Sequence, residues 1–167
     1  MASKKPIVRQ VAWLSIIPQL IFMGLLLLIF GLTISSFNLA LIIAMLTYLI
    51  ISNTLRRGIP HNHRKGISLY KAGKYEPAID EFKKSYDFFS KYAWLDKYRY
   101  LTLLTSSRIS YTEMALVNIA FCSSQIGDGL TAKQYYEKAL AQFPKSEIAI
   151  ASLNLISSIE NSRESSE

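Results

Sequence analysis

The hydrophobic pattern divides the chain into a long apolar N-terminal segment and a series of amphipathic ones. Residues 10–55 contain no Asp, Glu, Lys or Arg, which is a run of 46 residues. A single straight helix of that length would measure about 69 Å, roughly twice the hydrocarbon thickness of a bilayer. Two spans joined by a turn fit better, and the polar cluster within residues 33–38 supplies the turn. We therefore expect a transmembrane hairpin over residues 11–55, with spans at 11–32 and 37–55.

A cleaved secretory signal peptide is the competing interpretation of the first span. Such a peptide has a basic start, an apolar core of about 7–15 residues and a small-residue cleavage site. Here the apolar core runs past 20 residues, residues 31–34 lack the cleavage pattern, and a second apolar segment follows directly. These features favour a span that stays in the mature chain.

Small and helix-breaking residues predict how the two spans pack. Gly24 and Gly31 in the first span, and Ala40 and Ala44 in the second, are spaced so that helices can approach closely. The same residues leave self-association through the hairpin open. Pro18 can kink the first span. No ionisable residue lies at membrane depth, so transport of ions or charged substrates has no side chains to use.

Downstream of the hairpin, apolar residues recur at helical spacing. The predicted fold class is therefore all-α: an N-terminal two-helix transmembrane hairpin followed by a small domain of helical hairpins. Residues 98–104 are also rich in strand-forming types, which leaves that segment open. Ser110 and Glu113 form an S-x-x-E capping box, and Gly73 and Gly127 are expected to end helices. The expected helices cover residues 63–73, 75–89, 93–105, 111–126 and 130–143, and a last one begins at Ser146.

The net charge of +7 is concentrated beside the two spans. Residues 1–65 hold seven basic side chains and no acidic one, whereas residues 66–167 hold twelve of each sign. By the positive-inside rule, both termini should lie in the cytoplasm of a protein integral to a membrane, which we expect to be a bacterial plasma membrane. Because the folded part has no basic face, nucleic acid is not an expected partner.

The pattern predicts five segments in order along the chain. They are a basic tail (1–10), the hairpin (11–55), a basic linker (56–62), a helical domain (63–160) and a polar, flexible tail (161–167). Four basic side chains near the membrane are also placed to touch anionic lipid headgroups: Arg56, Arg57, Arg64 and Lys65.

Residues suited to catalysis or to metal binding are sparse. Cys122 is the one cysteine and lies in an apolar helical stretch, which is typical of a small core residue. His61 and His63 are separated by Asn62 and have no supporting acid or cysteine nearby, which indicates a polar linker rather than a zinc site. Phosphate-loop, zinc-protease and nucleophile-elbow motifs are absent from the sequence. We expect neither an enzyme nor a bound cofactor.

Two segments of the chain align with each other at four positions, and the paired positions are always 54 residues apart. Small residues let two antiparallel helices cross, and an aromatic fills the gap beside them: the pairs are Gly73 and Gly127, Tyr75 and Gly129, Ala78 and Ala132, and Phe82 and Tyr136. Upstream, Gly66 aligns with Ala120. This pattern resembles the tetratricopeptide repeat. The first copy is degenerate, with Ser85 at a small-residue position and no terminal proline. The second copy fills the family's preferred positions with Leu116, Ile119, Ala120, Gly127, Ala132, Tyr136, Ala139, Leu140 and Pro144.

The spacing of 54 exceeds the 34 residues of the family repeat. About 20 residues, from 91 to 110, are therefore inserted between the two copies, which is room for one extra helix. A stack of about three units is needed for a stable solenoid. We expect the extra helix and the final helix, or else a partner, to complete the core.

The resemblance implies that a partner binds along the first helix of each repeat. The family's clamp for a terminal carboxylate uses Lys and Asn, and His63 and Ile67 occupy those places here, so that clamp is not expected. A mostly apolar surface with Lys71 and Gln125 at one end suits an amphipathic helix or hydrophobic peptide. Ile67 and Phe121 have a second interpretation, as core residues or residues covered by the extra helix. By position, the candidate groove comprises His63, Ile67, Tyr70, Lys71, Val117, Asn118, Phe121, Ser124 and Gln125.

Three functions compete at this point. The leading hypothesis is a membrane-tethered interaction protein, a scaffold or adaptor that presents the repeats to a protein or peptide at the cytoplasmic face. The alternative is a subunit or assembly factor of a membrane complex, which would use the hairpin itself as its contact. An enzyme is the remote third. The expected partners are an unidentified protein or peptide and membrane lipid.

Overall fold

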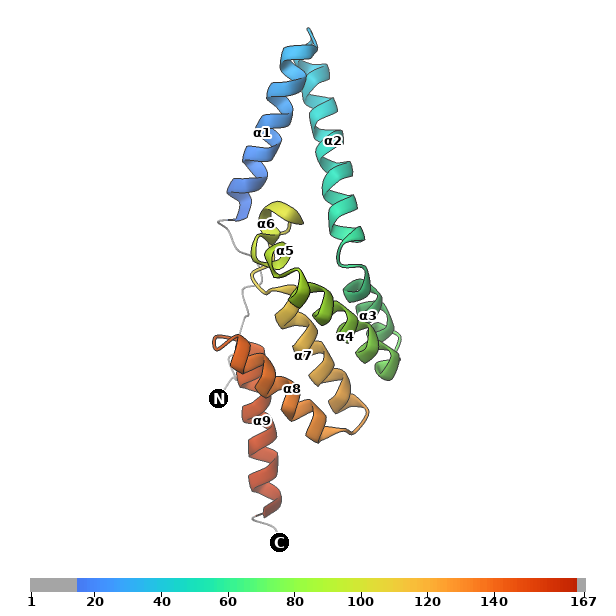
Figure 1. Cartoon of the computed structure of the whole chain (residues 1–167), viewed down its shortest axis with the longest axis vertical. Helices are drawn as coiled ribbons and strands as arrows, with labels where there is room; N and C mark the ends of the chain where they lie inside the picture. The colour runs from blue at the N-terminus through green and yellow to red at the C-terminus, as the bar shows by residue number, and fades with distance from the viewer. Residues whose placement is uncertain (1–14, 165–167) are drawn as a thin grey trace, which may run out of the picture. The chain divides into compact units, whose positions relative to one another are not determined.

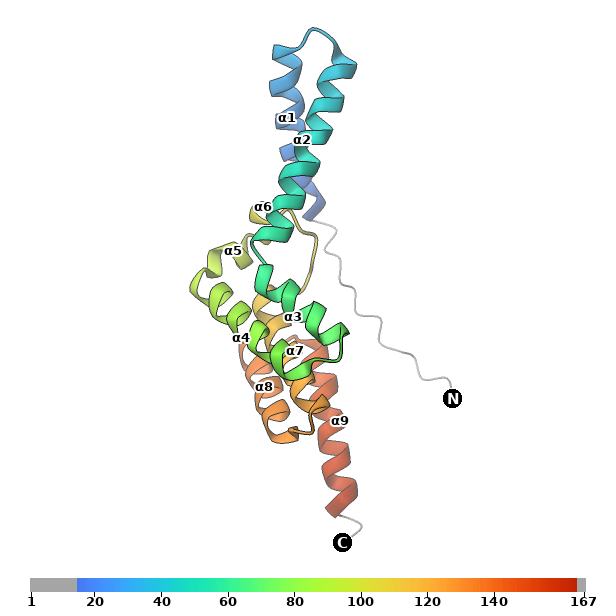
Figure 2. The ribbon, with the colours of Figure 1, turned by 90° about the vertical axis from the view of Figure 1, so that its right-hand side faces the viewer.

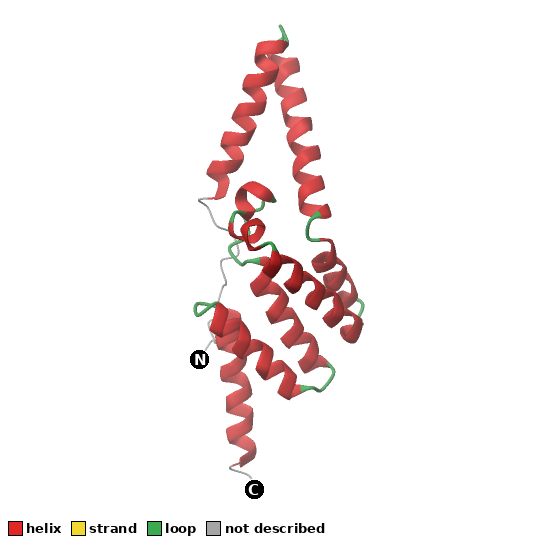
Figure 3. Ribbon diagram, viewed as in Figure 1, coloured by secondary structure: helices red, strands yellow, loops and turns green. Residues whose placement is uncertain are grey.

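The computed structural model describes residues 15–164 and is helical throughout, with turns but no strand in that range. Figure 3 shows this all-helical composition, which confirms the predicted fold class. The chain forms two compact units. The first comprises Met1–Pro60, of which the structure describes residues 15–60, together with Ala93–Arg108. The second comprises His61–Tyr92 and Ile109–Glu167, described as far as residue 164.

A helical hairpin begins the first unit. Helices α1 (Ile16–Thr33) and α2 (Phe37–Gly58) pack on each other and are both long and apolar enough to cross a membrane. At 18 and 22 residues they measure about 27 and 33 Å, close to the thickness of the hydrocarbon layer. The turn between them lies where the polar cluster predicts it (Figure 1). Residues 11–14 of the expected first span lie outside the described residues.

The small residues of the hairpin divide into two groups. Ala40 and Ala44 have no exposed surface, as close packing in the hairpin requires. A Cβ at Gly24 or Gly31 would meet nothing within 4 Å, so these two glycines do not bring α1 close to α2, contrary to the expectation for the hairpin. Pro18 lies in the first turn of α1, where a missing N–H breaks no helical hydrogen bond and no kink is needed.

Five helices build the second unit. They are α3 (His61–Lys71), α4 (Tyr75–Lys91), α7 (Tyr111–Gln125), α8 (Gly129–Gln142) and α9 (Glu147–Glu164). Helices α3 and α4 form one hairpin, α7 and α8 form a second, α4 packs along α7, and α9 packs on α8 (Figure 2). The two hairpins are therefore in direct contact although an insertion separates them in the sequence.

Several helix boundaries in this unit differ from the prediction, since α3 ends at Lys71 instead of residue 73 and α4 ends at Lys91 instead of residue 89. Helix α3 begins at His61, two residues early, because the linker enters the helix immediately after Pro60. Helix α9 continues to Glu164, beyond the point at which the tail was expected to be flexible. Lys133 of α8 makes an ion pair with Glu160 at 2.8 Å, which links the last turns of α9 to the preceding helix.

The inserted segment is not one helix over residues 93–105, as was expected. It contains two short helices, α5 (Ala93–Lys97) and α6 (Arg99–Thr102), with the break at Tyr98. The Arg99 guanidinium donates to the carbonyls of Asp96 at 3.0 Å, Ser107 at 3.0 Å and Arg108 at 2.6 Å, which folds the segment back on itself. The segment belongs to the same compact unit as the hairpin, and the buried clusters of the second unit contain none of its residues.

The core of the second unit consists of two neighbouring groups of buried side chains. Small residues occupy the helix crossings, and larger aliphatic and aromatic residues surround them. One group contains Ala78, Ile79, Phe82, Ile119 and Cys122. The other contains Leu116, Val117, Ala120, Tyr136, Ala139 and Ala149, the last of these supplied by α9. Helix α9 thus provides the core completion that was expected of the final helix.

Candidate functional site

The two helical hairpins turn in the same way. Gly73 and Gly127 follow α3 and α7 with φ of 70° and 83°, a left-handed conformation that favours glycine. The amide of Lys74 donates to the carbonyl of Leu69, and 54 positions later the amide of Asp128 donates to the carbonyl of Ser123, both at 3.0 Å. The expected stops at both glycines are confirmed. The C-terminal ends of α3 and α7 are therefore built alike.

The helix crossings also correspond. A Cβ at Gly66 would lie 2.7 Å from the Phe82 ring, so α3 and α4 approach too closely there for any side chain. In the second hairpin, Ala120 has no exposed surface and Tyr136 is buried in the same cluster. Ala132, expected at the crossing of α7 and α8, is completely buried.

The serine that makes the first copy degenerate has a partner. Ser85 is buried, and its Oγ lies 3.4 Å from Nδ1 of His63. The His63 ring contacts Phe82 and Tyr111 edge-on, with ring centroids 5.4 and 5.3 Å apart. His63 is therefore a core residue of the α3–α4–α7 packing rather than an accessible member of the candidate groove.

Three further groove candidates are partly or completely buried in the second unit. Val117 is buried in the core cluster, and Asn118 is half-buried. Ile67 packs against the cluster around Phe82, which agrees with its alternative interpretation as a core residue. The inner parts of α3 and α7 thus hold the two hairpins together and offer little to a partner.

The remaining five candidates are exposed at the C-terminal ends of α3 and α7. Tyr70 and Phe121 are 36% and 37% exposed, and their rings meet edge to face with centroids 5.6 Å apart. We call this patch the α3–α7 surface, and its residues are Tyr70, Lys71, Phe121, Ser124 and Gln125.

One aromatic neighbour of this surface was missed by the sequence analysis. The Tyr75 ring lies 6.2 Å from the Tyr70 ring and widens the aromatic part of the patch. The repeat alignment pairs Tyr75 with Gly129. An aromatic residue in one copy where the other has glycine could have indicated that Tyr75 lies beside this surface. Ser124 uses its hydroxyl inside the helix, since its Oγ donates to the Phe121 carbonyl at 2.7 Å.

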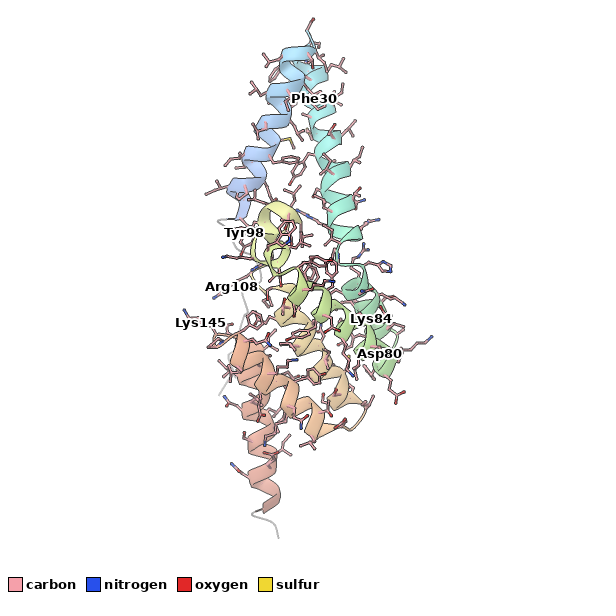
Figure 4. The ribbon with its side chains drawn as sticks, viewed as in Figure 1. Phe30, Asp80, Lys84, Tyr98, Arg108 and Lys145 are labelled. Carbon is pink, nitrogen blue, oxygen red and sulfur yellow. The ribbon has the colours of Figure 1, made fainter. Side chains whose placement is uncertain are left out.

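The basic residues expected near lipid have different surroundings. Lys65 makes an ion pair with the buried carboxylate of Glu81 at 3.0 Å, and Lys84, labelled in Figure 4, makes another at 2.8 Å. Hydrogen bonds from Lys84 and then Lys65 hold the pKa of Glu81 below its usual value. Lys65 therefore serves the packing of α3 on α4. Arg57 and Arg64 are exposed.

The remaining chemical candidates do not form a site. Burial raises the pKa of Cys122 to about 11, so its thiol is protonated at neutral pH and is a poor nucleophile. His61 is exposed whereas His63 is buried. Within residues 15–164, no three or more His, Cys, Asp or Glu side chains gather in a group able to hold a metal ion.

No family model, no curated protein and no solved structure matches the chain. The likeness to the tetratricopeptide repeat rests on the residues that recur at a spacing of 54 positions and on the places they occupy in the two hairpins.

Proposed function

We propose that this chain is a membrane-tethered interaction protein. In this proposal a two-span hairpin anchors a tetratricopeptide-like pair of helical hairpins at the cytoplasmic face of a membrane. The α3–α7 surface then binds an amphipathic helix or hydrophobic peptide of another protein. The observation that carries the proposal is the half-exposed aromatic pair Tyr70–Phe121, which the equivalent helices of both hairpins supply together.

The side chains of α1 and α2 support the anchoring. Their outward faces expose many large apolar residues, whereas a soluble monomeric protein rarely exposes a contiguous apolar patch larger than a few hundred Å². A hydrocarbon layer removes this surface from water, and both helices have the length to cross one. The exposed residues on these faces include Leu20, Ile21, Leu25, Leu28, Leu32, Phe37, Ile42, Leu46, Leu49 and Ile50.

The proposed orientation follows from charge. Arg56 and Arg57 end α2, and Lys4, Lys5 and Arg9 precede the first span, whereas the turn between the spans carries no charge. Basic flanks remain on the cytoplasmic side in most membrane proteins. Both termini and the helical repeats are therefore proposed to face the cytoplasm.

Direct packing of α4 on α7 supports the repeat assignment. Repeats of this kind bury a continuous core by stacking on their neighbours. Here α4 and α7 make the contact between the copies although residues 92–110 separate them. The two hairpins therefore stack directly on each other despite the insertion. Two unrelated hairpins would have no reason to stack in this way.

The chemistry of the surface suits an apolar helical ligand. Two aromatic rings provide contact area at low entropic cost, and Lys71 and Gln125 supply polar groups that can orient a ligand. The exposed edges of Tyr70 and Phe121 would become buried on binding. Tyrosine is among the residue types that contribute most to interface affinity once binding has removed them from water.

Capture of partners by the full chain in mild detergent tests this proposal. The double substitution Tyr70→Ala and Gln125→Ala should weaken capture by about tenfold, which corresponds to roughly 1.4 kcal/mol. Leu130→Ala with Gln134→Ala is the matched control, because both residues are exposed and belong to α8 rather than to the α3–α7 surface. Equal capture by the two double variants would contradict the proposed surface.

The same experiment distinguishes the alternative function. A subunit or assembly factor would contact its complex through the hairpin, so capture would survive the Tyr70 and Gln125 substitutions. It would be lost when α1 and α2 are replaced by an unrelated two-span anchor. The interaction-protein proposal predicts the opposite result for both changes.

A further inference from the structure

The inserted segment, residues 93–108, has both buried and exposed side chains. Helix α6 packs on α1, and Leu103 and Leu104 are buried. The Arg56 guanidinium at the end of α2 donates to the carbonyl of Leu104. Leu104 takes up a left-handed conformation with φ of 47°, which is uncommon for leucine and is held here by this surrounding structure.

The exposed side of the segment is aromatic and apolar. Trp94, Tyr98 and Leu101 are 57%, 51% and 58% exposed. They recur at i, i+4 and i+7, and the amide of Tyr98 donates to the carbonyl of Trp94, so the chain keeps these residues on one side through the break between α5 and α6. Figure 4 labels Tyr98 at this break.

The position of the segment along the hairpin follows from its bond to Arg56. Arg56 lies 19 residues after Phe37, which is about 29 Å along a helix and one hydrocarbon thickness from the start of α2. If α2 spans the membrane, Arg56 reaches the headgroup layer. The Leu104 carbonyl that it binds lies at the same level. Helix α6, which ends just before Leu104, lies beside the open ends of the hairpin (Figure 1).

The charge of this unit matches an anionic lipid surface. Asp96 is the one acidic residue in residues 15–60 and 93–108, and it is buried. Basic side chains accompany the exposed aromatics, with Lys97 Nζ 5.5 Å from the centre of the Tyr98 ring. The other basic residues of these segments are Arg56, Arg57, Arg99 and Arg108.

We infer that residues 93–108 form an interfacial anchor, in which Trp94, Tyr98 and Leu101 enter the headgroup layer of the membrane that the hairpin crosses. Trp and Tyr favour this layer because their rings are apolar and their N–H and O–H groups stay wet. Lysine and arginine beside them attract anionic headgroups. The inference rests on the proposed membrane anchoring and adds a third contact with the bilayer.

Fluorescence quenching in vesicles tests the inference with the full chain. Trp13→Phe leaves Trp94 as the one tryptophan. The chain is reconstituted into phosphatidylcholine and phosphatidylglycerol vesicles that contain lipids brominated either near the headgroup or near the bilayer centre. We expect a blue-shifted Trp94 emission, a loss of fluorescence that is greater with the shallow bromines, and weak quenching by iodide.

Two reporter variants separate failure of the inference from failure of the anchoring. Both carry Trp13→Phe and Trp94→Phe. Leu25→Trp places a reporter in the middle of α1 on its exposed face, and bromines at the bilayer centre should quench it most. Leu130→Trp places one on the exposed part of α8, and only iodide should quench it.

Each alternative outcome overturns the inference. If iodide quenches Trp94 freely and brominated lipids do not, Trp94 lies in water. If neither quenches it, Trp94 is covered by protein. Greatest quenching by the deep bromines would place the segment inside the hydrocarbon. Equal lipid quenching of Leu130→Trp would show a general surface contact. If Leu25→Trp is also unquenched by lipid, the membrane anchoring itself fails.

Discussion

At position 66 the chain has room for a hydrogen atom and for nothing larger. A Cβ there would lie 2.7 Å from the Phe82 ring, which has no exposed surface toward which it could move. We expect Gly66→Ala to lower the free energy of unfolding by about 1–3 kcal/mol because the crossing becomes overpacked. Urea unfolding of the full chain in mild detergent measures this.

Gly129→Ala is the control for that substitution. It lies at the start of α8, and an added Cβ meets nothing within 4 Å. This variant should be neutral or slightly more stable, since alanine is the better helix former. Similar losses at positions 66 and 129 would show that the α3–α4 crossing is not as close as described.

Glu81 predicts a dependence of stability on pH. Its folded-state pKa lies below the ordinary value of 4.5 because Lys84 and Lys65 donate hydrogen bonds to the carboxylate. A lowered pKa stabilises the fold above the unfolded-state value, and this contribution is lost as pH falls through the lower folded value. The stability lost in Glu81→Gln should therefore be constant near neutral pH and shrink below about pH 4.5. A difference that grows on acidification would contradict the ion pairs.

Cys122 should be inert in the folded chain. Its side chain is buried, and burial raises the pKa of the thiol to about 11. A maleimide at neutral pH should label it only after denaturation, as mass spectrometry would show. Ser124→Cys in a Cys122→Ser background places a thiol at an exposed position two residues away and should react quickly. Rapid labelling of Cys122 itself would mean that the α7 core is open.

At the scale of helices, the start of α7 depends on one side chain. The Ser110 hydroxyl accepts a hydrogen bond from the Glu113 amide at 3.0 Å, as the S-x-x-E pattern predicts. Ser110→Ala should cost roughly 0.5–2 kcal/mol, whereas Ser110→Asp keeps an acceptor and should cost much less. Thermal unfolding followed by circular dichroism compares the two. Equal losses would rule out the cap as the cause.

Helices with strong local signals were predictable from sequence, and the inserted segment was not. The capping box at Ser110 and the glycines at 73 and 127 determine ends through local backbone geometry, so sequence identifies them. Residues 93–108 carry aromatic and β-branched types with little local preference. Arg99 organises this segment through hydrogen bonds to three carbonyls, which no periodicity encodes.

Sequence predicted which helices carry the candidate surface, but it did not predict which of their residues are exposed. A resemblance assigns positions to the inner face of a helix, and it does so without regard to how closely the neighbouring helix approaches. Because α4 packs directly on α7, His63 and Val117 became core, while Tyr70 and Phe121 near the helix ends stayed exposed. Exposure is a property of the packed unit rather than of the segment.

For the molecule as a whole, we propose above all that a two-span hairpin holds the helical repeats on the cytoplasmic side. Length, apolar character and basic flanks support it. These features belong to the segment itself, so sequence alone predicts them. The inserted segment, by contrast, groups with the hairpin only through tertiary contacts.

Reporter fusions measure this claim most directly. Alkaline phosphatase, active only outside the cytoplasm, and green fluorescent protein, fluorescent within it, are each fused in the turn at Ser36 and after the C-terminus. The account predicts active phosphatase at Ser36 and fluorescence at the C-terminus. Active phosphatase at the C-terminus would contradict it, because the repeats and their aromatic surface would then lie on the opposite side of the membrane from the partner that they are proposed to bind.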